Sequence, residues 1–168
     1  MNDYYDMRLK HYNLSILKSS YDSNQLAVYS GDICDDTFLG DIFERESLTH
    51  IIHLAARAGV RPSIHDPSLY VRTNVDGTSK LLDLARRYAI HNFVFASSSS
   101  VYGGSLKNVL SESDVVSRPV SPYAATKITC ELLAFTFHHL YGLNTTGLRF
   151  FTVYGPRGRP DMAPFKFI

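Results

Sequence analysis

The stretch HIIHLAA, residues 50–56, decides the fold of this chain. It is a short run of continuous apolar character, which is typical of a strand buried in a parallel sheet. The segment before it, residues 35–46, predicts a helix capped by Asp35 or Asp36. The segment after it, residues 70–88, carries apolar residues at helical spacing. A strand with a helix on each side is the repeating unit of an α/β protein.

The same alternation continues in both directions along the chain. Further strands are predicted at residues 25–30, which end at Gly31-Asp32, at 92–97 and at 145–151. Further helices are predicted at residues 3–18 and 122–141, and loops at 103–120 and 152–168. This succession predicts an α/β fold, a Rossmann-like doubly wound sheet of parallel strands flanked by helices. Ligands bind such sheets beyond the carboxyl ends of the strands.

Composition excludes several classes of protein. The chain has 168 residues and a net charge of +1, so no bulk charge favours nucleic acid or a membrane surface. No apolar stretch approaches 18 residues and no secretory leader is visible, so we expect a soluble, cytoplasmic protein. Cys34 and Cys130 are expected to stay reduced. The adjacent His138 and His139 point to different sides of a helix, so no metal site is expected.

The heptapeptide SPYAATK, residues 121–127, carries the clearest chemical signal. Ser121 is a favourable N-cap and Pro122 a favourable first helical residue, so a helix is predicted to begin here. Tyr123 and Lys127 then lie one turn apart on the same side of the helix. An ammonium near a phenol stabilises the phenolate, and such a phenolate can take a proton from an alcohol and return it. A hydroxyl at the end of strand 92–97 could hold the same alcohol.

Several motifs in fixed order resemble one family. They are Gly31-Asp32-Ile33, His53 to Ala56, Asn74 with Gly77, Ser98 to Gly103, Tyr123-x-x-x-Lys127 and Arg149 to Pro156. The set resembles the extended short-chain dehydrogenase/reductases, in their NAD-dependent epimerase/dehydratase group. Within that group the chain is most similar to the UDP-glucuronate 4-epimerases. The resemblance covers nearly the whole chain.

The resemblance implies a set of catalytic residues and a bound NAD. Tyr123 is the expected base, Lys127 supports it and binds the nicotinamide ribose, and Ser98 or its neighbour Ser99 orients the reacting hydroxyl. Asp32 and Ile33 are expected at the adenine. The other residues expected around the cofactor are Leu54, Ala55, Ala56, Ala96, Ser97, Phe150 and Val153, with Asn74 as a scaffold.

The resemblance also implies a nucleotide-sugar substrate, with a UDP-uronate as the first expectation. Arg61, Thr152 and Arg159 are the expected substrate contacts, beside Ser98 and Tyr123. Arg61 as a plain surface charge is the alternative. Related dehydratases and decarboxylases carry acids where this chain has Ser99 and Ser100, which favours epimerisation without elimination. A UDP-hexose 4-epimerase is the nearest alternative.

Two departures from the family pattern limit this interpretation. The sequence has no Gly-x-x-Gly-x-x-Gly turn for the cofactor pyrophosphate, and the family's C-terminal substrate domain does not follow. Residues 1–168 are therefore expected to form a partial NAD(P)-binding domain, with 152–168 beginning the substrate-binding region. The strand at 25–30 would lack its neighbours, so the chain is expected to be poorly stable, inactive or rearranged. An inactive remnant that binds a nucleotide or a partner is the alternative from another class. A homodimer through the helices at 70–88 and 122–141 is also expected.

Overall fold

The computed structural model describes residues 4–167, which divide into two compact units. One unit is Asp32–Phe151, and the other combines Met1–Gly31 with Thr152–Ile168. The first unit contains the sheet and the helices that pack on it.

The sheet of the Asp32–Phe151 unit has three parallel strands in the order β1-β2-β3. They are β1 (His50–His53), β2 (Asn92–Ala96) and β3 (Thr145–Leu148). Ile51 is paired with Phe93, and Phe95 with Gly147. Three of the predicted strands therefore form, and the predicted α/β class is confirmed. Strand β3 ends at Leu148, three residues before the predicted end at residue 151.

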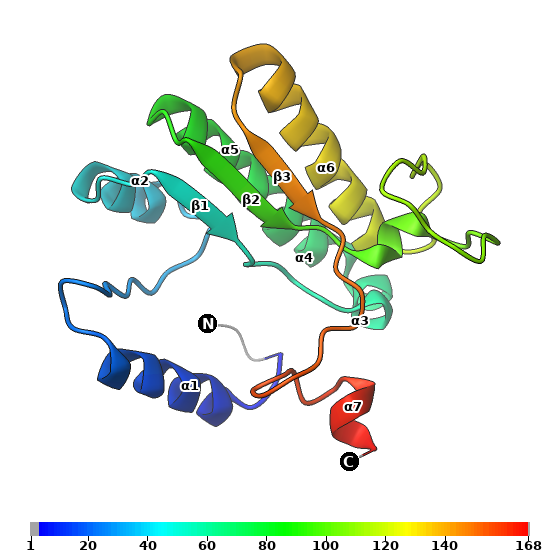
Figure 1. The fold of residues 1–168 in the computed structure, drawn as a ribbon, viewed down its shortest axis with the longest axis horizontal. Coiled ribbons are helices and arrows are strands. Elements are labelled where there is room, and N and C mark those ends of the chain that lie inside the picture. Colours follow the sequence, from blue (N-terminus) through cyan, green and yellow to red (C-terminus); the bar gives the residue numbers. More distant parts are fainter. Residues whose placement is uncertain (1–3, 168) are drawn as a thin grey trace. The chain divides into compact units, whose positions relative to one another are not determined.

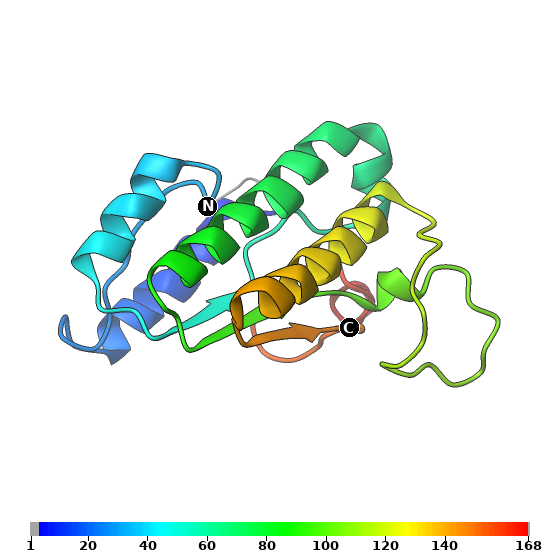
Figure 2. The same ribbon diagram turned by 90° about the horizontal axis from the view of Figure 1, so that it is seen from above.

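Helices pack on one face of this sheet, as Figures 1 and 2 show. They are α2 (Asp36–Arg45), α5 (Gly77–Arg87) and α6 (Pro122–Tyr141). The core forms where inward-facing strand residues meet these helices. Its buried members are Leu39, Phe43, Leu81, Leu82, Leu84, Ala85, Ile90, Phe93, Phe95, Cys130, Ala134 and Leu143. Amphipathic helices stabilise such a sheet by removing apolar area from water.

The opposite face of the sheet is less covered within this unit. Ile52 is 72% exposed, whereas its neighbour His53 is buried. The prediction that residues 50–56 are buried on both faces is therefore wrong for β1. The physical reason is that α2, α5 and α6 all lie on one face, so alternate side chains of the strand face away from them.

The helix predicted at residues 70–88 forms, but with an interruption. It follows α3 (Val60–His65) and begins as α4 (Pro67–Tyr70). It continues through a π-helical turn at Val71–Asp76 into α5. Such turns are frequent at functional sites.

Helix α6 has the bounds that the sequence predicts. The Ser121 side chain accepts a hydrogen bond of 3.1 Å from the Ala124 N–H, and Pro122 is the first helical residue. Gly142 ends the helix with a φ of 70°, a left-handed conformation that glycine adopts without strain. A short 3₁₀ turn at Ser99–Tyr102 precedes the loop at 103–120, which contains no regular element.

The second unit contains α1 (Met7–Ser20) and the single turn α7 (Ala163–Lys166). The helix predicted from Asp3 to Lys18 corresponds to α1, although Asp3 lies outside the described residues. The strand predicted at residues 25–30 is wrong, because this segment contains no regular secondary structure and pairs with none of the three described strands. A strand needs a neighbour for its backbone hydrogen bonds, and none of the three described strands pairs with it. The loop predicted at 152–168 is interrupted by α7.

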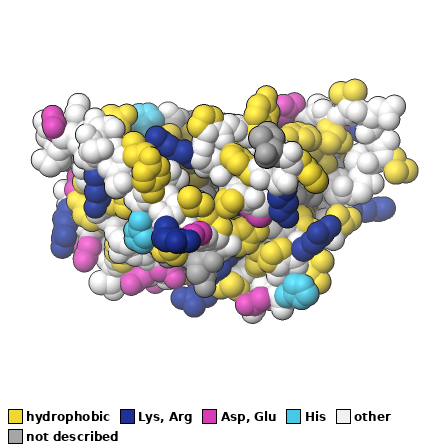
Figure 3. Space-filling model, turned by 90° about the horizontal axis from the view of Figure 1, so that it is seen from below, with side chains coloured by type: hydrophobic (Ala, Val, Ile, Leu, Met, Phe, Trp, Pro, Cys, Tyr) yellow, Lys and Arg dark blue, Asp and Glu magenta, His cyan; other side chains and the backbone are white. Residues whose placement is uncertain are grey.

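Exposed apolar side chains are common in this second unit. Tyr12, Tyr154 and Phe167 are 62%, 79% and 87% exposed. Figure 3 shows apolar side chains interspersed with charged ones on the face that it presents. Among the described residues, no helix has the length and apolarity needed to cross a membrane.

Candidate active site

Tyr123 and Lys127 lie on consecutive turns at the start of α6. The Lys127 side chain is buried, and its Nζ donates a hydrogen bond of 2.7 Å to the Ala96 carbonyl at the end of β2. The same Nζ is 5.9 Å from the centroid of the Tyr123 ring. Burial lowers the pKa of the Lys127 ammonium, because the charged form loses hydration. The helix thus places a half-buried phenol beside a buried amine.

Two neighbouring elements hold Tyr123 in place. Its N–H donates a hydrogen bond of 3.1 Å to the buried Ser63 hydroxyl of α3. Its ring lies edge-on to the ring of Tyr70, with centroids 6.3 Å apart. The Tyr70 hydroxyl in turn donates to the Ala58 carbonyl over 2.7 Å. The orientation of Tyr123 is therefore fixed by contacts to the loop and helices that follow β1.

The serines at the end of β2 have different partners. The Ser97 hydroxyl donates to the carboxylate of Glu131, so its side chain turns toward α6. The Ser98 hydroxyl is buried and accepts a hydrogen bond of 3.2 Å from the Ser100 N–H. Ser99 is half-buried, and its N–H donates 2.8 Å to the Phe150 carbonyl. The ends of β2 and β3 are thereby joined, and the 3₁₀ turn at Ser99–Tyr102 packs against α6.

Asn74 connects the loop after β1 to α6. Its Oδ1 accepts 2.7 Å from the Arg57 N–H, and its Nδ2 donates to the Arg57 carbonyl and the Thr126 hydroxyl, both over 3.0 Å. The Thr126 hydroxyl donates 2.7 Å to the Tyr123 carbonyl. Asn74 is fully buried with its amide satisfied, so it fixes the backbone near Tyr123.

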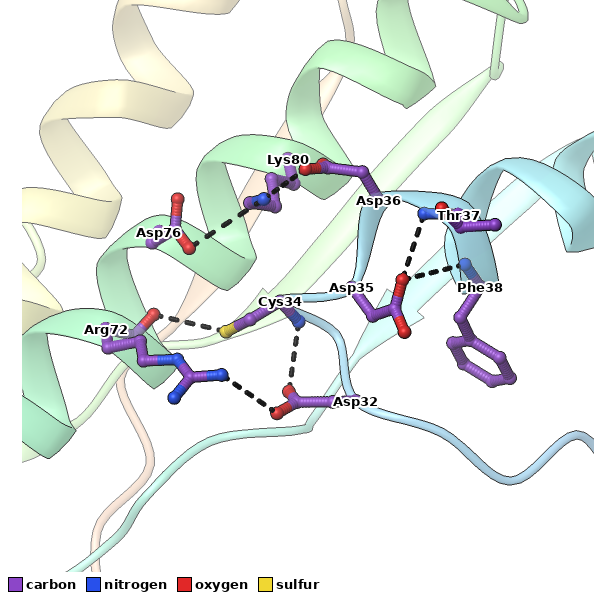
Figure 4. A network of polar contacts seen from close by, with 9 residues as sticks. All are labelled: Asp32, Cys34, Asp35, Asp36, Thr37, Phe38, Arg72, Asp76 and Lys80. Atoms are coloured by element: carbon purple, nitrogen blue, oxygen red, sulfur yellow. Dashed lines mark hydrogen bonds and ion pairs between the residues drawn. The ribbon is translucent and has the colours of Figure 1, made fainter.

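The segment Asp32–Phe38 forms a network with the helix that contains Arg72 and Lys80 (Figure 4). The Asp32 carboxylate accepts 3.0 Å from the Cys34 N–H and lies 3.7 Å from the Arg72 guanidinium. It is 57% exposed, so it keeps lone pairs free for a further donor. Ile33 is half-buried, and a Cβ added to Gly77 would lie 2.6 Å from its Cδ1. Glycine at position 77 therefore allows Ile33 to pack against the helix.

The other expected ligand residues occupy different surroundings. Leu54 is 60% exposed, Ala55 is exposed and Ala56 is half-buried, all in the loop after β1. Phe150 is 41% exposed beyond β3. Arg61 is exposed on α3, and its side chain forms no hydrogen bond or ion pair within the part of the chain that the structure describes. The expected residues of this unit therefore lie at or beyond the carboxyl ends of its strands, or on the helices beside them.

Three further expected residues, Thr152, Val153 and Arg159, belong to the second unit. Thr152 and Val153 are exposed. Arg159 is held within its own unit, because its Nε donates 2.6 Å to Asp161 and its guanidinium lies 5.2 Å from the centroid of the Tyr4 ring. The structure therefore does not place these three residues relative to Tyr123.

The sequence interpretation assigned no role to two groups near the site. Glu131 lies one turn after Lys127 on the same side of α6, and it forms a bidentate ion pair with Arg149. His53 is buried at the end of β1, with its Nε2 2.9 Å from the Thr78 hydroxyl. Burial and the charge of Lys127 lower the His53 pKa to about 4. The signal for Glu131 was its position four residues after Lys127. The signal for His53 was its place at the start of the His53 to Ala56 motif.

Comparisons with known proteins agree with this architecture. A UDP-glucuronate 4-epimerase from Thermodesulfobacterium geofontis is 48% identical over 168 residues, which are 100% of this chain and 51% of that protein. The crystal structure of a UDP-glucuronic acid 4-epimerase from Bacillus cereus, in complex with UDP-glucuronic acid and NAD, matches with a TM-score of 0.79 and 35% identity. The match covers 95% of this chain and 48% of that one.

A dTDP-glucose 4,6-dehydratase from Streptomyces venezuelae, with NAD bound, has a TM-score of 0.83 at 32% identity over 94% of this chain and 47% of that one. The chain thus spans about half the length of the curated relatives that it matches. The family model described as GDP-mannose 4,6 dehydratase matches residues 4–168. Because that match includes almost every residue, the chain belongs to the GDP-mannose 4,6 dehydratase family.

Proposed function

We propose that this chain takes part in the NAD-dependent 4-epimerisation of a nucleotide sugar, with UDP-glucuronate and UDP-galacturonate as the interconverted pair. The proposal rests on the position of the buried Lys127 amine. Its Nζ binds the carbonyl of Ala96, two residues before Ser98, and lies 5.9 Å from the centroid of the Tyr123 ring. The proposal takes residues 1–168 as a partial NAD(P)-binding domain in which 152–168 begin the substrate-binding region. The boundary between the two units, at Phe151–Thr152, supports that division.

The residues present suit the two ends of a bound NAD. Lys127 donates one ammonium hydrogen to the Ala96 carbonyl, so two N–H donors remain for the nicotinamide ribose. Asp32 offers an exposed carboxylate to the adenine amine, and Ile33 offers an apolar surface to its ring. Leu54 and Phe150 would be covered by the cofactor, together with Ala55, Ala56, Ala96, Ser97 and Val153. The chemistry that NAD supplies when bound is reversible acceptance of a hydride from the sugar.

The chain's own residues would handle the proton of the sugar hydroxyl. In this proposal Ser98 orients the C4 hydroxyl, and the Tyr123 phenolate oxygen takes its proton. The Lys127 ammonium stabilises the phenolate through its positive charge. Tyr123 later returns the proton to the C4 oxygen from the same position. Asn74 keeps Tyr123 in place by holding the adjacent backbone through Thr126.

The residues around position 98 favour epimerisation over elimination. Ser99 and Ser100 lie in the 3₁₀ turn directly after Ser98, and neither supplies a carboxyl group for an acid step. Arg61, Thr152 and Arg159 are proposed to contact the substrate, because guanidinium groups bind carboxylates and phosphates through paired hydrogen bonds. Arg159 would have to exchange its present partner, Asp161, for the substrate.

The direct test is an incubation of the chain with NAD⁺ and UDP-glucuronate, followed by chromatography for UDP-galacturonate. We expect conversion, against the sequence-based expectation of an inactive or poorly stable chain, and we expect it to disappear in Tyr123→Phe. Conversion of UDP-glucose but not of UDP-glucuronate would show that the substrate is a UDP-hexose and not a UDP-uronate. Binding of the nucleotide sugar without any conversion, measured by calorimetry, would support the inactive remnant and overturn the enzymatic proposal.

The proposal includes a homodimer and a cytoplasmic location, the latter as the sequence predicts. Apolar side chains on α6 support a dimer through residues 70–88 and 122–141, since Leu132, Phe135 and Leu140 are each at least 60% exposed. Large apolar side chains that a helix leaves exposed are candidates for an interface. Sedimentation of Phe135→Glu against the parent chain tests this, with a shift to monomer as the expected result.

A further inference from the structure

The Glu131 carboxylate joins helix α6 to the ends of two strands. The Arg149 guanidinium, just after β3, donates to it with Nε over 3.0 Å and with Nη2 over 2.9 Å. The Ser97 hydroxyl, just after β2, donates to the same carboxylate. The side chains of Glu131 and Arg149 are only 19% and 16% exposed. One carboxylate thus accepts three hydrogen bonds from two strand ends.

This contact is the second of two that run from α6 to the end of β2. One turn earlier, Lys127 donates to the carbonyl of Ala96. Consecutive turns of the helix therefore bind consecutive residues of the strand end, Ala96 through its backbone and Ser97 through its side chain. The next residue is Ser98. The position of Ser98 relative to α6 is consequently fixed by these two contacts, which come from the side of the helix that carries Tyr123.

Arg149 holds the carboxylate from the other direction and extends the contact. Its Nη1 donates 3.2 Å to the Glu112 carbonyl in the loop at 103–120. Its guanidinium lies 5.0 Å from the centroid of the Tyr102 ring, in the 3₁₀ turn that begins directly after Ser98. Hydrogen bonds from the guanidinium to Glu131 raise the Arg149 pKa, so the guanidinium keeps its charge. The turn is therefore fixed at both of its ends.

Stability alone gives a poor reason for this arrangement. A largely buried ion pair contributes little net stability, because desolvation of both charges opposes their attraction. Apolar side chains of similar size would fill the same space. What apolar side chains cannot provide is a directional acceptor for the Ser97 hydroxyl.

We infer that Glu131 is a positioning residue that, through Ser97 and Arg149, sets where Ser98 lies relative to Tyr123 and Lys127. The inference rests on the proposed function, since it concerns the geometry of that site. Glu131 itself touches neither the substrate nor the cofactor in this assignment.

The test compares four variants of the chain. Ser97→Ala removes the link to β2 and leaves the ion pair, which makes it the least disruptive variant. Glu131→Ala removes both links, and Glu131→Gln keeps an acceptor for Ser97 and for Arg149. Asp83→Asn is the matched control, because it breaks an acid–arginine pair on α5, with Arg86, away from the site. Melting temperature, steady-state rates with UDP-glucuronate and the NMR signal of the Lys127 ammonium are recorded for each.

We expect Ser97→Ala to melt near the parent temperature while its kcat falls about tenfold and its KM stays constant. Glu131→Ala should lose more, and Glu131→Gln should recover part of the loss. The ammonium of Lys127 should give a slowly exchanging NMR signal in the parent chain that broadens in Ser97→Ala and Glu131→Ala but not in Asp83→Asn. Equal kcat and an unchanged ammonium signal in Ser97→Ala would overturn the inference.

The NMR arm separates this inference from the proposed function. If the parent chain shows no turnover, the proposed function fails, but the ammonium signal still reports whether Ser97 and Glu131 hold the strand end against Lys127. A signal lost in Ser97→Ala then supports the positioning contact, and a signal retained in both Ser97→Ala and Glu131→Ala refutes it.

Discussion

The Nζ of Lys127 lies 2.7 Å from the carbonyl oxygen of Ala96, so a buried amine is bound to the last residue of strand β2. This contact predicts the result of Lys127→Met, which keeps the length of the side chain and removes every donor. Turnover should fall by roughly 10²- to 10⁴-fold, the range typical of lost acid–base assistance. Lys80→Met is the control, because Lys80 pairs with Asp36 outside the proposed site. Equal rates for the two variants would contradict the role given to Lys127.

Tyr123→Phe removes only the phenol oxygen and keeps the ring that lies against Tyr70. We expect turnover to fall by roughly 10²- to 10⁴-fold, because no other group of the site would accept the sugar proton. The melting temperature should not change, since the Ser63 contact uses the backbone of residue 123. Tyr21→Phe, at an exposed position, serves as the control. Rates are compared by quenched time points, and a variant as active as the parent would exclude Tyr123 as the base.

His53 predicts a pH dependence of stability. Its pKa falls from 6.5 in the unfolded chain to about 4 in the folded one, because burial and Lys127 disfavour the imidazolium. The unfolded state therefore binds more protons in this window, and stability is lost as the pH falls from 6.5 toward 4. The loss amounts to about 3 kcal/mol at most, from the 1.36 kcal/mol carried by each pKa unit.

Urea unfolding at several pH values checks the His53 prediction. The carboxylates also titrate in this range, so the quantity of interest is the difference between the parent chain and His53→Gln, which keeps a polar group for Thr78. The free energy of unfolding of the parent chain minus that of His53→Gln should decrease as the pH falls. A difference that stays constant across these pH values would mean that His53 does not titrate on unfolding in this window.

Two glycines give a matched pair of stability predictions. A Cβ added to Gly147 in β3 would lie 2.8 Å from Cζ of the buried Phe95, so Gly147→Ala should lower the free energy of unfolding by about 1–3 kcal/mol. A Cβ added to Gly40 in α2 meets nothing within 4 Å. Gly40→Ala should therefore raise that free energy by about 0.5–1 kcal/mol. Thermal or urea unfolding distinguishes the two, and the same sign for both would contradict the packing described for β3.

Local signals explain which elements the sequence could predict. Both ends of α6 follow from neighbouring residues alone, Ser121 and Pro122 at its start and Gly142 at its end. The strand expected at 25–30 failed because a strand depends on a partner that the local sequence does not specify. The π-helical turn at Val71–Asp76 also left no signal, since apolar spacing cannot distinguish one extra residue in a turn.

The residues of the candidate site also divide into those that local sequence predicts and those that depend on tertiary packing. Tyr123 and Lys127 could be paired from their spacing, because one helix presents both side chains on one side. The pairing of Glu131 with Ser97 and Arg149 depends on how three separate elements pack, so the sequence interpretation did not find it. Ser97 is expected beside the cofactor, and only the structure shows that its hydroxyl donates to Glu131. Such side-chain choices become visible only when the tertiary structure is known.

The π-helical turn at Val71–Asp76 has a consequence for how this chain can vary. Each residue of an α-helix advances the helix by about 100°, so the extra residue sets the rotational phase between α4 and α5. Asn74 can then reach Arg57 and Thr126 while Leu81 and Leu82 face the core. Loss of a single codon within this turn would rotate one of these groups away from its partners. The segment is therefore far more sensitive to a change of length than to a change of surface side chain.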